Sequence, residues 1–190
     1  MRCISITCAL GLSVLLANPC LASKDLPRSL GEMHLGAAPA ERLLVPRGDS
    51  TGPVRSVRQV RELKPDSARV MWASLMPGAR ATDISGSVTL YRGNVVSVDL
   101  ASPGLTFELA QAAAVRRFGN GFPGQNLISD VPDGCAPYMF EQWVAGKLGL
   151  FLVGDTKSPG VSLHLRDNDL NHQMSMDDAV HIEYEQCIEF

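Results

Sequence analysis

Three of the four histidines lie near the end of the chain, at His164, His172 and His181, with several aspartates around them. Neutral imidazole and carboxylate are ligands that zinc and related metals use, so these histidines are the candidates for a metal site. The chain has neither an H-E-x-x-H nor an H-x-H spacing, and polar side chains on an exposed sheet face explain the cluster without a metal. Residues 167–169 (Asp-Asn-Asp) resemble the start of a calcium loop, but the rest of that pattern is missing, so we predict a plain turn.

Four basic residues recur at every third position: Arg55, Arg58, Arg61 and Lys64. On a helix they would drift slowly around one face, which could meet an acidic partner, lipid head groups or a cell-wall polymer. A solvated face with Glu62 as the local counter-charge is the simpler interpretation. These four are candidate binding residues without an assigned ligand.

The acidic residues Glu183, Glu185 and Glu189 have the chemistry for general acid and base catalysis. They repeat along one expected strand with no cleft implied, so ordinary solvation explains them. The chain has no G-x-S-x-G nucleophile elbow, no phosphate-binding loop and no dinucleotide fingerprint. We therefore assign no catalytic residue, expect no cofactor, and favour a protein that is not an enzyme.

The start of the chain has the features of a cleavable secretory signal. Arg2 precedes an apolar stretch over residues 4–16, and Cys20-Leu21-Ala22 has small residues at the two positions that a signal peptidase inspects. The apolar stretch is shorter than the roughly 20 residues that a membrane-spanning helix needs, and Pro19 before Cys20 does not fit a lipid-attachment site. We expect cleavage near Ala22 and a periplasmic or secreted product without a transmembrane segment.

Removing residues 1–22 leaves Cys135 and Cys187 out of five cysteines. Two cysteines in an oxidising compartment are most simply a disulfide, which in the chain-entropy model would stabilise the fold by about 4 kcal/mol. The signal contains one basic and no acidic residue, so the processed chain keeps 16 of 17 basic and all 20 acidic residues, a net charge of −4. This mild charge gives no reason to expect a nucleic-acid partner.

The first part of the processed chain predicts little regular structure. Residues 23–53 carry four prolines, which indicates an irregular lead-in with at most a short helix near residues 40–45. Residues 54–190 are expected to form a single domain. Apolar residues at every third position over 54–63 fit either a helical stripe or a distorted strand, and residues 68–75 predict a buried strand.

The later patterns are clearer. Alternation over residues 88–100, on either side of Arg92-Gly93-Asn94, predicts a hairpin, and apolar spacing between Thr106 and Gly119 predicts a helix over 106–118. Residues 119–137 predict a long loop. Further strands are expected over four ranges: 139–144, 148–153, 161–166 and 179–190.

Alternation along the last two of these strands places His164 and His181 away from the core. The expected fold class is therefore α+β, an antiparallel sheet of about five to seven strands packed against one main helix, after an irregular N-terminal lead-in.

The hairpin, the helix ending at Phe118-Gly119 and the strand with Trp143 resemble, over about residues 86–190, small envelope modules of bacterial lipoproteins and β-lactamase-inhibitor-like proteins. The resemblance rests on the order of elements and transfers no functional residue. Size, the signal, one disulfide and the missing catalytic motifs favour an exported non-catalytic protein that binds another macromolecule, such as an inhibitor, an immunity-type protein or an accessory factor. The expected partner is another protein. The alternatives are a small secreted metal-dependent hydrolase using the C-terminal histidines, and a structural or self-assembling envelope component.

Overall fold

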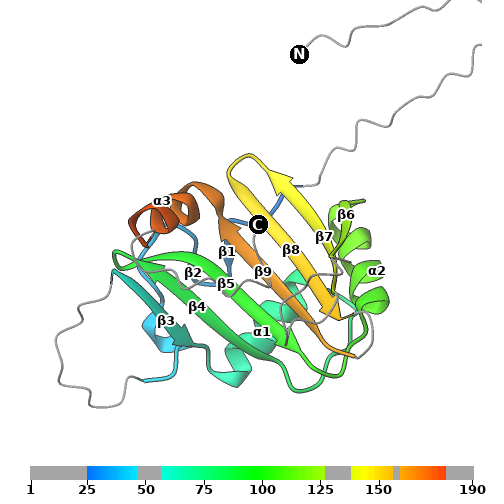
Figure 1. Ribbon diagram of the computed structural model, residues 1–190. Coiled ribbons are helices and arrows are strands. Elements are labelled where there is room, and N and C mark those ends of the chain that lie inside the picture. The colour runs from blue at the N-terminus through cyan, green and yellow to red at the C-terminus, as the bar shows by residue number, and fades with distance from the viewer. Residues whose placement is uncertain (1–24, 47–56, 127–137, 156–158, 179–190) are drawn as a thin grey trace, which may run out of the picture.

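The computed structural model describes residues 25–46, 57–126, 138–155 and 159–178. Their main feature is a seven-stranded antiparallel sheet (Figure 1) in the order β3-β4-β5-β9-β8-β7-β6. Its strands are β3 (Arg58–Glu62), β4 (Ser85–Tyr91), β5 (Asn94–Ser102), β6 (Phe122–Asn126), β7 (Tyr138–Ala145), β8 (Leu148–Asp155) and β9 (Val161–Asp167). The other elements are the helices α1 (Pro65–Leu75), α2 (Phe107–Phe118) and α3 (Asn168–Asp178), the short strands β1 (Ser29–Leu30) and β2 (Met33–His34), and the 3-10 turn η1 (Glu41–Leu43). The predicted α+β class and antiparallel sheet are confirmed.

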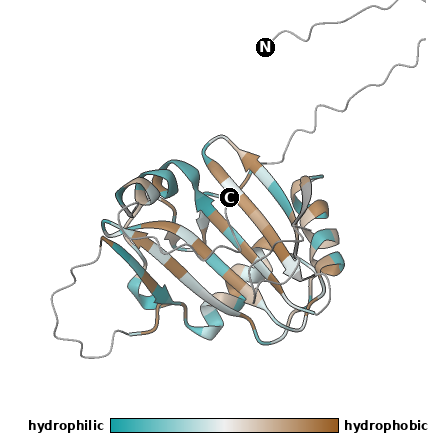
Figure 2. Ribbon diagram, in the orientation of Figure 1, coloured by the Kyte–Doolittle hydropathy of each residue, from teal (hydrophilic) through white to brown (hydrophobic). Residues whose placement is uncertain are grey.

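Alternation along the strands divides the sheet into two faces, and Figure 2 shows how apolar and polar residues succeed one another along them. On the core face, one row of paired and buried residues crosses six strands: Arg61, Val88, Val98, Leu165, Leu150 and Trp143. Helices α1 and α2 pack their apolar sides into the same core, so two helices cover this face instead of one.

The opposite face, which we call the open face, carries a second row across all seven strands: Glu62, Ser87, Asp99, His164, Phe151, Gln142 and Phe122. Helix α3 covers one end of it, where Met174 packs against Tyr91 and Val96. The rest of the open face is not covered by a helix in the described part of the chain. Among the described helices, none has the length and apolar character to cross a membrane.

Helix α2 confirms the helix predicted from the sequence. Thr106 has extended backbone angles before its first turn, and the helix ends at Gly119, whose φ of +81° suits a residue without a Cβ. The Trp143 indole donates a hydrogen bond of 2.8 Å to the Gly119 carbonyl, and its ring lies 6.1 Å from that of Phe118. These contacts fix the end of α2 against β7.

The prediction of a strand over residues 68–75 is wrong, because this segment forms most of α1. Pro65 opens the helix, where its missing N–H costs no intrahelical hydrogen bond. The buried residues follow helical spacing at Ala68, Met71, Trp72 and Leu75. Val70, which favoured a strand, is exposed to solvent.

The structure also tests the predictions for residues 54–63 and 119–137. Of the two structures left open for residues 54–63, the described part forms the strand β3, whose side chains alternate between the faces of the sheet. The loop predicted over 119–137 is wrong at its start, where β6 pairs with β7. Residues 127–137 lie outside the described residues.

The turn predicted at residues 167–169 is wrong, since this is where α3 begins. The buried Asp167 carboxylate accepts hydrogen bonds from the backbone N–H groups of Asp169 and Leu170 at 3.1 and 3.2 Å, as an N-cap does. Its other oxygen lies 3.1 Å from Lys147 Nζ, and Asn168 N donates to the Lys147 carbonyl. The start of α3 is thus fixed to the turn between β7 and β8.

The lead-in contributes to the core over its described part. Its buried side chains, Leu26, Leu30, Met33 and Leu44, belong to the same cluster as those of the sheet and helices. The short helix expected near residues 40–45 is the 3-10 turn η1. The strand predicted over 179–190 lies outside the described residues.

Candidate functional site

The centre of the open face holds a hydrogen-bonded pair of side chains made by two neighbouring strands. Asp99 on β5 is the direct partner of His164 on β9, and Asp99 Oδ1 lies 2.9 Å from His164 Nδ1. An ionised carboxylate can only accept hydrogen bonds, so Nδ1 must carry the proton and Nε2 is left to meet a ligand. The pair fixes both the imidazole orientation and its tautomer.

Ser97 completes this group without forming a nucleophile. Its hydroxyl donates to Asp99 Oδ2 at 2.9 Å, so serine and histidine both bind the same carboxylate. In a serine hydrolase the hydroxyl instead bonds the imidazole that removes its proton. Ser97 is therefore not placed as a nucleophile activated by His164.

Arg166 lies next to this group on β9. Its guanidinium carbon is 4.0 Å from the ring centroid of Phe151, and its Nε donates to Asn168 Oδ1 at 3.0 Å. Burial lowers the pKa of the Arg166 guanidinium, while the negative charge of Asp99 raises it. Arginine keeps its proton in proteins, so this is a partly desolvated cation held in one position by stacking and one hydrogen bond.

A glycine makes room for this arrangement. Gly149 on β8 is the direct partner of Arg166. A Cβ on Gly149 would lie 2.8 Å from Phe151 Cε2 and 2.9 Å from Asn168 Oδ1, closer than Cβ atoms approach in proteins. Only a glycine therefore lets the ring and the amide that support Arg166 lie where they do.

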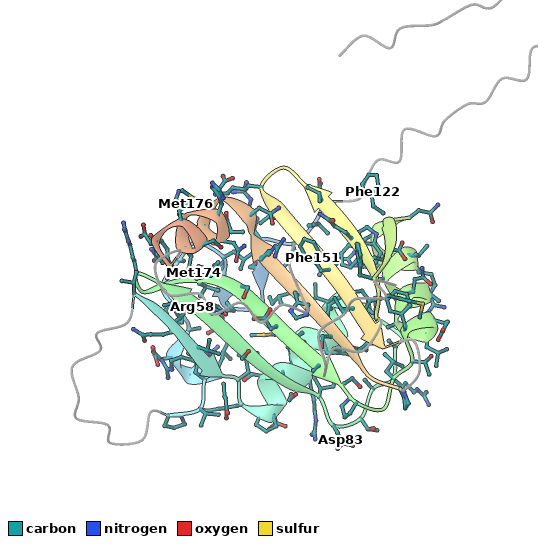
Figure 3. The ribbon with its side chains drawn as sticks, viewed as in Figure 1. Arg58, Asp83, Phe122, Phe151, Met174 and Met176 are labelled. Atoms are coloured by element: carbon teal, nitrogen blue, oxygen red, sulfur yellow. The ribbon has the colours of Figure 1, made fainter. Side chains whose placement is uncertain are left out.

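Two cavities adjoin on the open face, and both are lined by Asp99 and His164. The smaller, of 280 Å³, is bounded by α3; Figure 3 labels Arg58, Phe151 and Met174 among its lining residues, which also include Thr89, Ser97, Arg166 and Asn171. The larger, of 530 Å³, continues past the pair and includes Glu62, Ser85, Ser87 and Ser162 in its lining. Together they form one groove, which we call the open-face groove.

The far end of α3 is fixed as well. The Tyr91 hydroxyl and Arg92 Nη2 both donate to Asp177 Oδ2, the second at 2.7 Å. These hydrogen bonds, the Tyr91 one above all, lower the pKa of the Asp177 carboxyl more than its partial loss of water raises it. Helix α3, which bounds the smaller cavity, is therefore held at both ends by carboxylates.

The predicted metal candidates do not gather in the described structure. His164 belongs to the groove, His172 is exposed on α3, and His181 lies outside the described residues. Within the described ranges, no three side chains of the histidine, cysteine, aspartate or glutamate types lie close enough to hold a metal ion. Cys135 and Cys187 also lie outside the described residues, so their disulfide stays a prediction.

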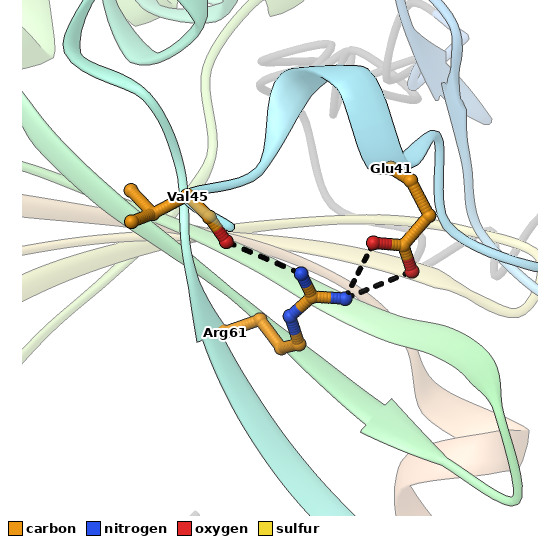
Figure 4. A network of polar contacts seen from close by, with 3 residues as sticks. All are labelled: Glu41, Val45 and Arg61. Carbon is orange, nitrogen blue, oxygen red and sulfur yellow. Dashed lines mark hydrogen bonds and ion pairs between the residues drawn. The ribbon is translucent and has the colours of Figure 1, made fainter. Parts of the chain in front are cut away.

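The basic stripe is divided by the strand conformation of β3. Arg58 lies on the open face, where it lines the smaller cavity, whereas Arg61 points to the other side. There Arg61 Nη1 donates to both carboxylate oxygens of Glu41 at 2.8 Å, and Nη2 donates to the Val45 carbonyl at 3.2 Å (Figure 4). Arg61 thus fixes the lead-in to the sheet.

The other two members of the stripe lie apart from this contact. Lys64 is exposed just before α1, and Arg55 lies outside the described residues. The structure therefore does not bring the stripe onto one surface.

Asp99, Arg166 and Phe151 were missed in the sequence. Alternation along β5 and β9 does place Asp99 and Arg166 on the face of His164, so the signal for the face was present. Nothing in the sequence indicated that β5 and β9 pair, because α2 and three strands separate them along the chain.

A scan against models of known protein families finds no match to this chain, and searches of curated proteins and of solved structures find none either. The resemblance to envelope modules therefore stays a prediction, and the case for a function rests on the open-face groove itself.

Proposed function

We propose that this protein is an exported, non-catalytic domain that binds a protein partner through the open-face groove. The observation that carries the proposal is the pair of adjoining cavities, 280 and 530 Å³ in volume, that share Asp99 and His164. Export is supported by the signal-like residues 1–22.

The composition of the groove favours a macromolecular partner. The smaller cavity is lined by residues of several strands and of α3, including two arginines and an aspartate. Arginine and aromatic residues, such as the stacked pair Arg166 and Phe151, are enriched in protein interfaces.

Affinity capture from the envelope fraction and medium of the producing cell tests the proposal. The processed protein, residues 23–190, would be used beside two variants that each gain an arginine. Ser162→Arg fills the larger cavity, whereas Val70→Arg changes an exposed position on α1. We expect a stoichiometric protein partner with the wild type and Val70→Arg, and its loss with Ser162→Arg.

The other classes of function predict different results in the same preparation. Stoichiometric metal in the purified protein would favour a metal-dependent hydrolase. Concentration-dependent assembly without a partner would favour a structural component. Repeated recovery of the protein alone, even after gentle crosslinking, would contradict partner binding.

A further inference from the structure

The smaller cavity has the chemistry to recognise one particular group of a partner. We propose that it receives a carboxylate, from an aspartate or glutamate side chain of the partner protein, and that Arg166 binds this carboxylate. This inference rests on the proposed function and specifies the partner's chemistry at the groove.

The geometry of Arg166 is the first argument. Stacking on Phe151 and the Nε bond to Asn168 hold the guanidinium in place. In the described part of the chain, its two terminal Nη groups have no hydrogen-bond acceptor, although the residue lines the cavity. A planar guanidinium fork matches a carboxylate with two parallel hydrogen bonds, and a fork that is already ordered loses less entropy on binding.

The charge of the cavity is the second argument. Its lining brings the Arg166 guanidinium close to the Asp99 carboxylate, whose oxygens are already bonded to Ser97 and His164. A singly charged carboxylate bound by Arg166 adds one negative charge beside Asp99, whereas a doubly charged phosphate adds two and is repelled more strongly.

The size of the cavity is the third argument. At 280 Å³ it lies at the lower end of the roughly 300–1,000 Å³ of small-molecule sites, so it has room for one carboxylate-bearing side chain. The adjoining 530 Å³ cavity provides space for the neighbouring residues of the partner's chain.

The test uses short peptides and the processed protein. The probe is the capped peptide acetyl-Gly-Gly-Glu-Gly-Gly-amide, and the Arg166 Nε–Hε resonance reports binding by NMR. We expect a saturable shift, and affinity about 10- to 100-fold weaker for the glutamine analogue, since charge-assisted bonds are lost. Arg166→Gln should weaken binding of the glutamate peptide by a similar factor; since this variant lacks the Arg166 resonance, backbone amide resonances near the cavity report its binding. Arg116→Gln, which changes an exposed arginine on α2, should leave the affinity unchanged.

Several results would overturn the inference. Equal affinity for the glutamate and glutamine peptides would do so, as would unchanged binding by Arg166→Gln. Tighter binding of uncapped pentaglycine would assign the site to a C-terminal carboxylate, and tighter binding of inorganic phosphate would assign it to another anion. Binding that appears only after removal of residues 179–190, which carry three glutamates, would identify the chain's own acidic end as the occupant.

Capture experiments separate this inference from the proposed function. A partner retained equally by the wild type and Arg166→Gln would leave the proposed function standing and refute the role of Arg166. Glutamate-peptide binding without any captured partner would support the carboxylate site and refute the proposed function.

Discussion

Gly149→Ala should disturb the support of Arg166 through crowding alone. The added Cβ would lie 2.8 Å from Phe151 Cε2 and 2.9 Å from Asn168 Oδ1, while ordinary contact begins at 3.4 Å, so these groups must move by about half an ångström. Overpacking of this kind costs about 1–3 kcal/mol. Alanine also lowers the conformational entropy of the unfolded chain, which stabilises the folded state by about 0.4–1 kcal/mol. The net loss in the free energy of unfolding is therefore about 1–2 kcal/mol.

Urea unfolding and thermal melts measure this loss. For a chain of this size, each 1 kcal/mol shifts the melting temperature by about 2–4 °C, so Tm should fall by about 2–8 °C. The Arg166 Nε–Hε resonance should move as well, because Asn168 holds that group.

Gly104→Ala provides the matched control for this change. A Cβ on Gly104 has Thr82 Oγ1 at 3.5 Å as its nearest neighbour, an ordinary contact, and Gly104 does not need a positive φ. Its stability should be unchanged or increased by up to about 1 kcal/mol. If Gly149→Ala is as stable as this control and leaves the Arg166 resonance in place, the close-packing argument is refuted.

Three further changes test other contacts. Arg61→Met should lower the free energy of unfolding by about 1–2 kcal/mol in urea, because three hydrogen bonds are lost, although the exposed ion-pair partner limits the effect; a more stable variant would mean that desolvation of the arginine dominates. Folding lowers the pKa of the Asp177 carboxyl from 3.8, so the stability that its hydrogen bonds add is complete above pH 3.8 and is lost as pH falls through the lower, folded pKa. In that acidic range hydrogen exchange should show α3 opening more readily, and the acid effect should be smaller in Tyr91→Phe. Equal acid effects in the two proteins would count against the hydrogen bond between Tyr91 and Asp177. The processed protein should contain no free thiol, and joint replacement of Cys135 and Cys187 by serine should cost up to about 4 kcal/mol in thermal unfolding; two titratable thiols would rule out the disulfide.

The contrast between α1 and α2 shows which sequence signals were decisive. Helix α2 was predictable because alanines, helical spacing and a terminal glycine agree. In α1 the same spacing exists from Ala68 to Leu75, but Val70 and Trp72 favour strands by propensity. Spacing decides here, because tertiary burial of one face outweighs the preference of single residues.

The candidate site was predictable only in part. Alternation in β9 assigns His164 to the face away from the core, as the structure confirms. Its partner could not be predicted, since strand pairing depends on the whole topology and the hydrogen bond joins residues 65 positions apart. The N-cap at Asp167 was missed for a related reason. An Asp-Asn-Asp sequence begins a turn or a helix equally well, and here α3 continues because Met174 finds an apolar cluster on the sheet.

The position of β9 between β5 and β8 has a consequence for how the molecule matures. These three strands are the middle of the sheet, yet β9 is the last of them to be synthesised. Pairs so distant in the chain close late in folding and slow it, because much loop entropy is lost before contacts form. The groove therefore forms late: a nascent chain, or a fragment that stops before residue 161, lacks His164 and Arg166 and cannot form it. If the proposed function is right, such a chain does not bind the partner.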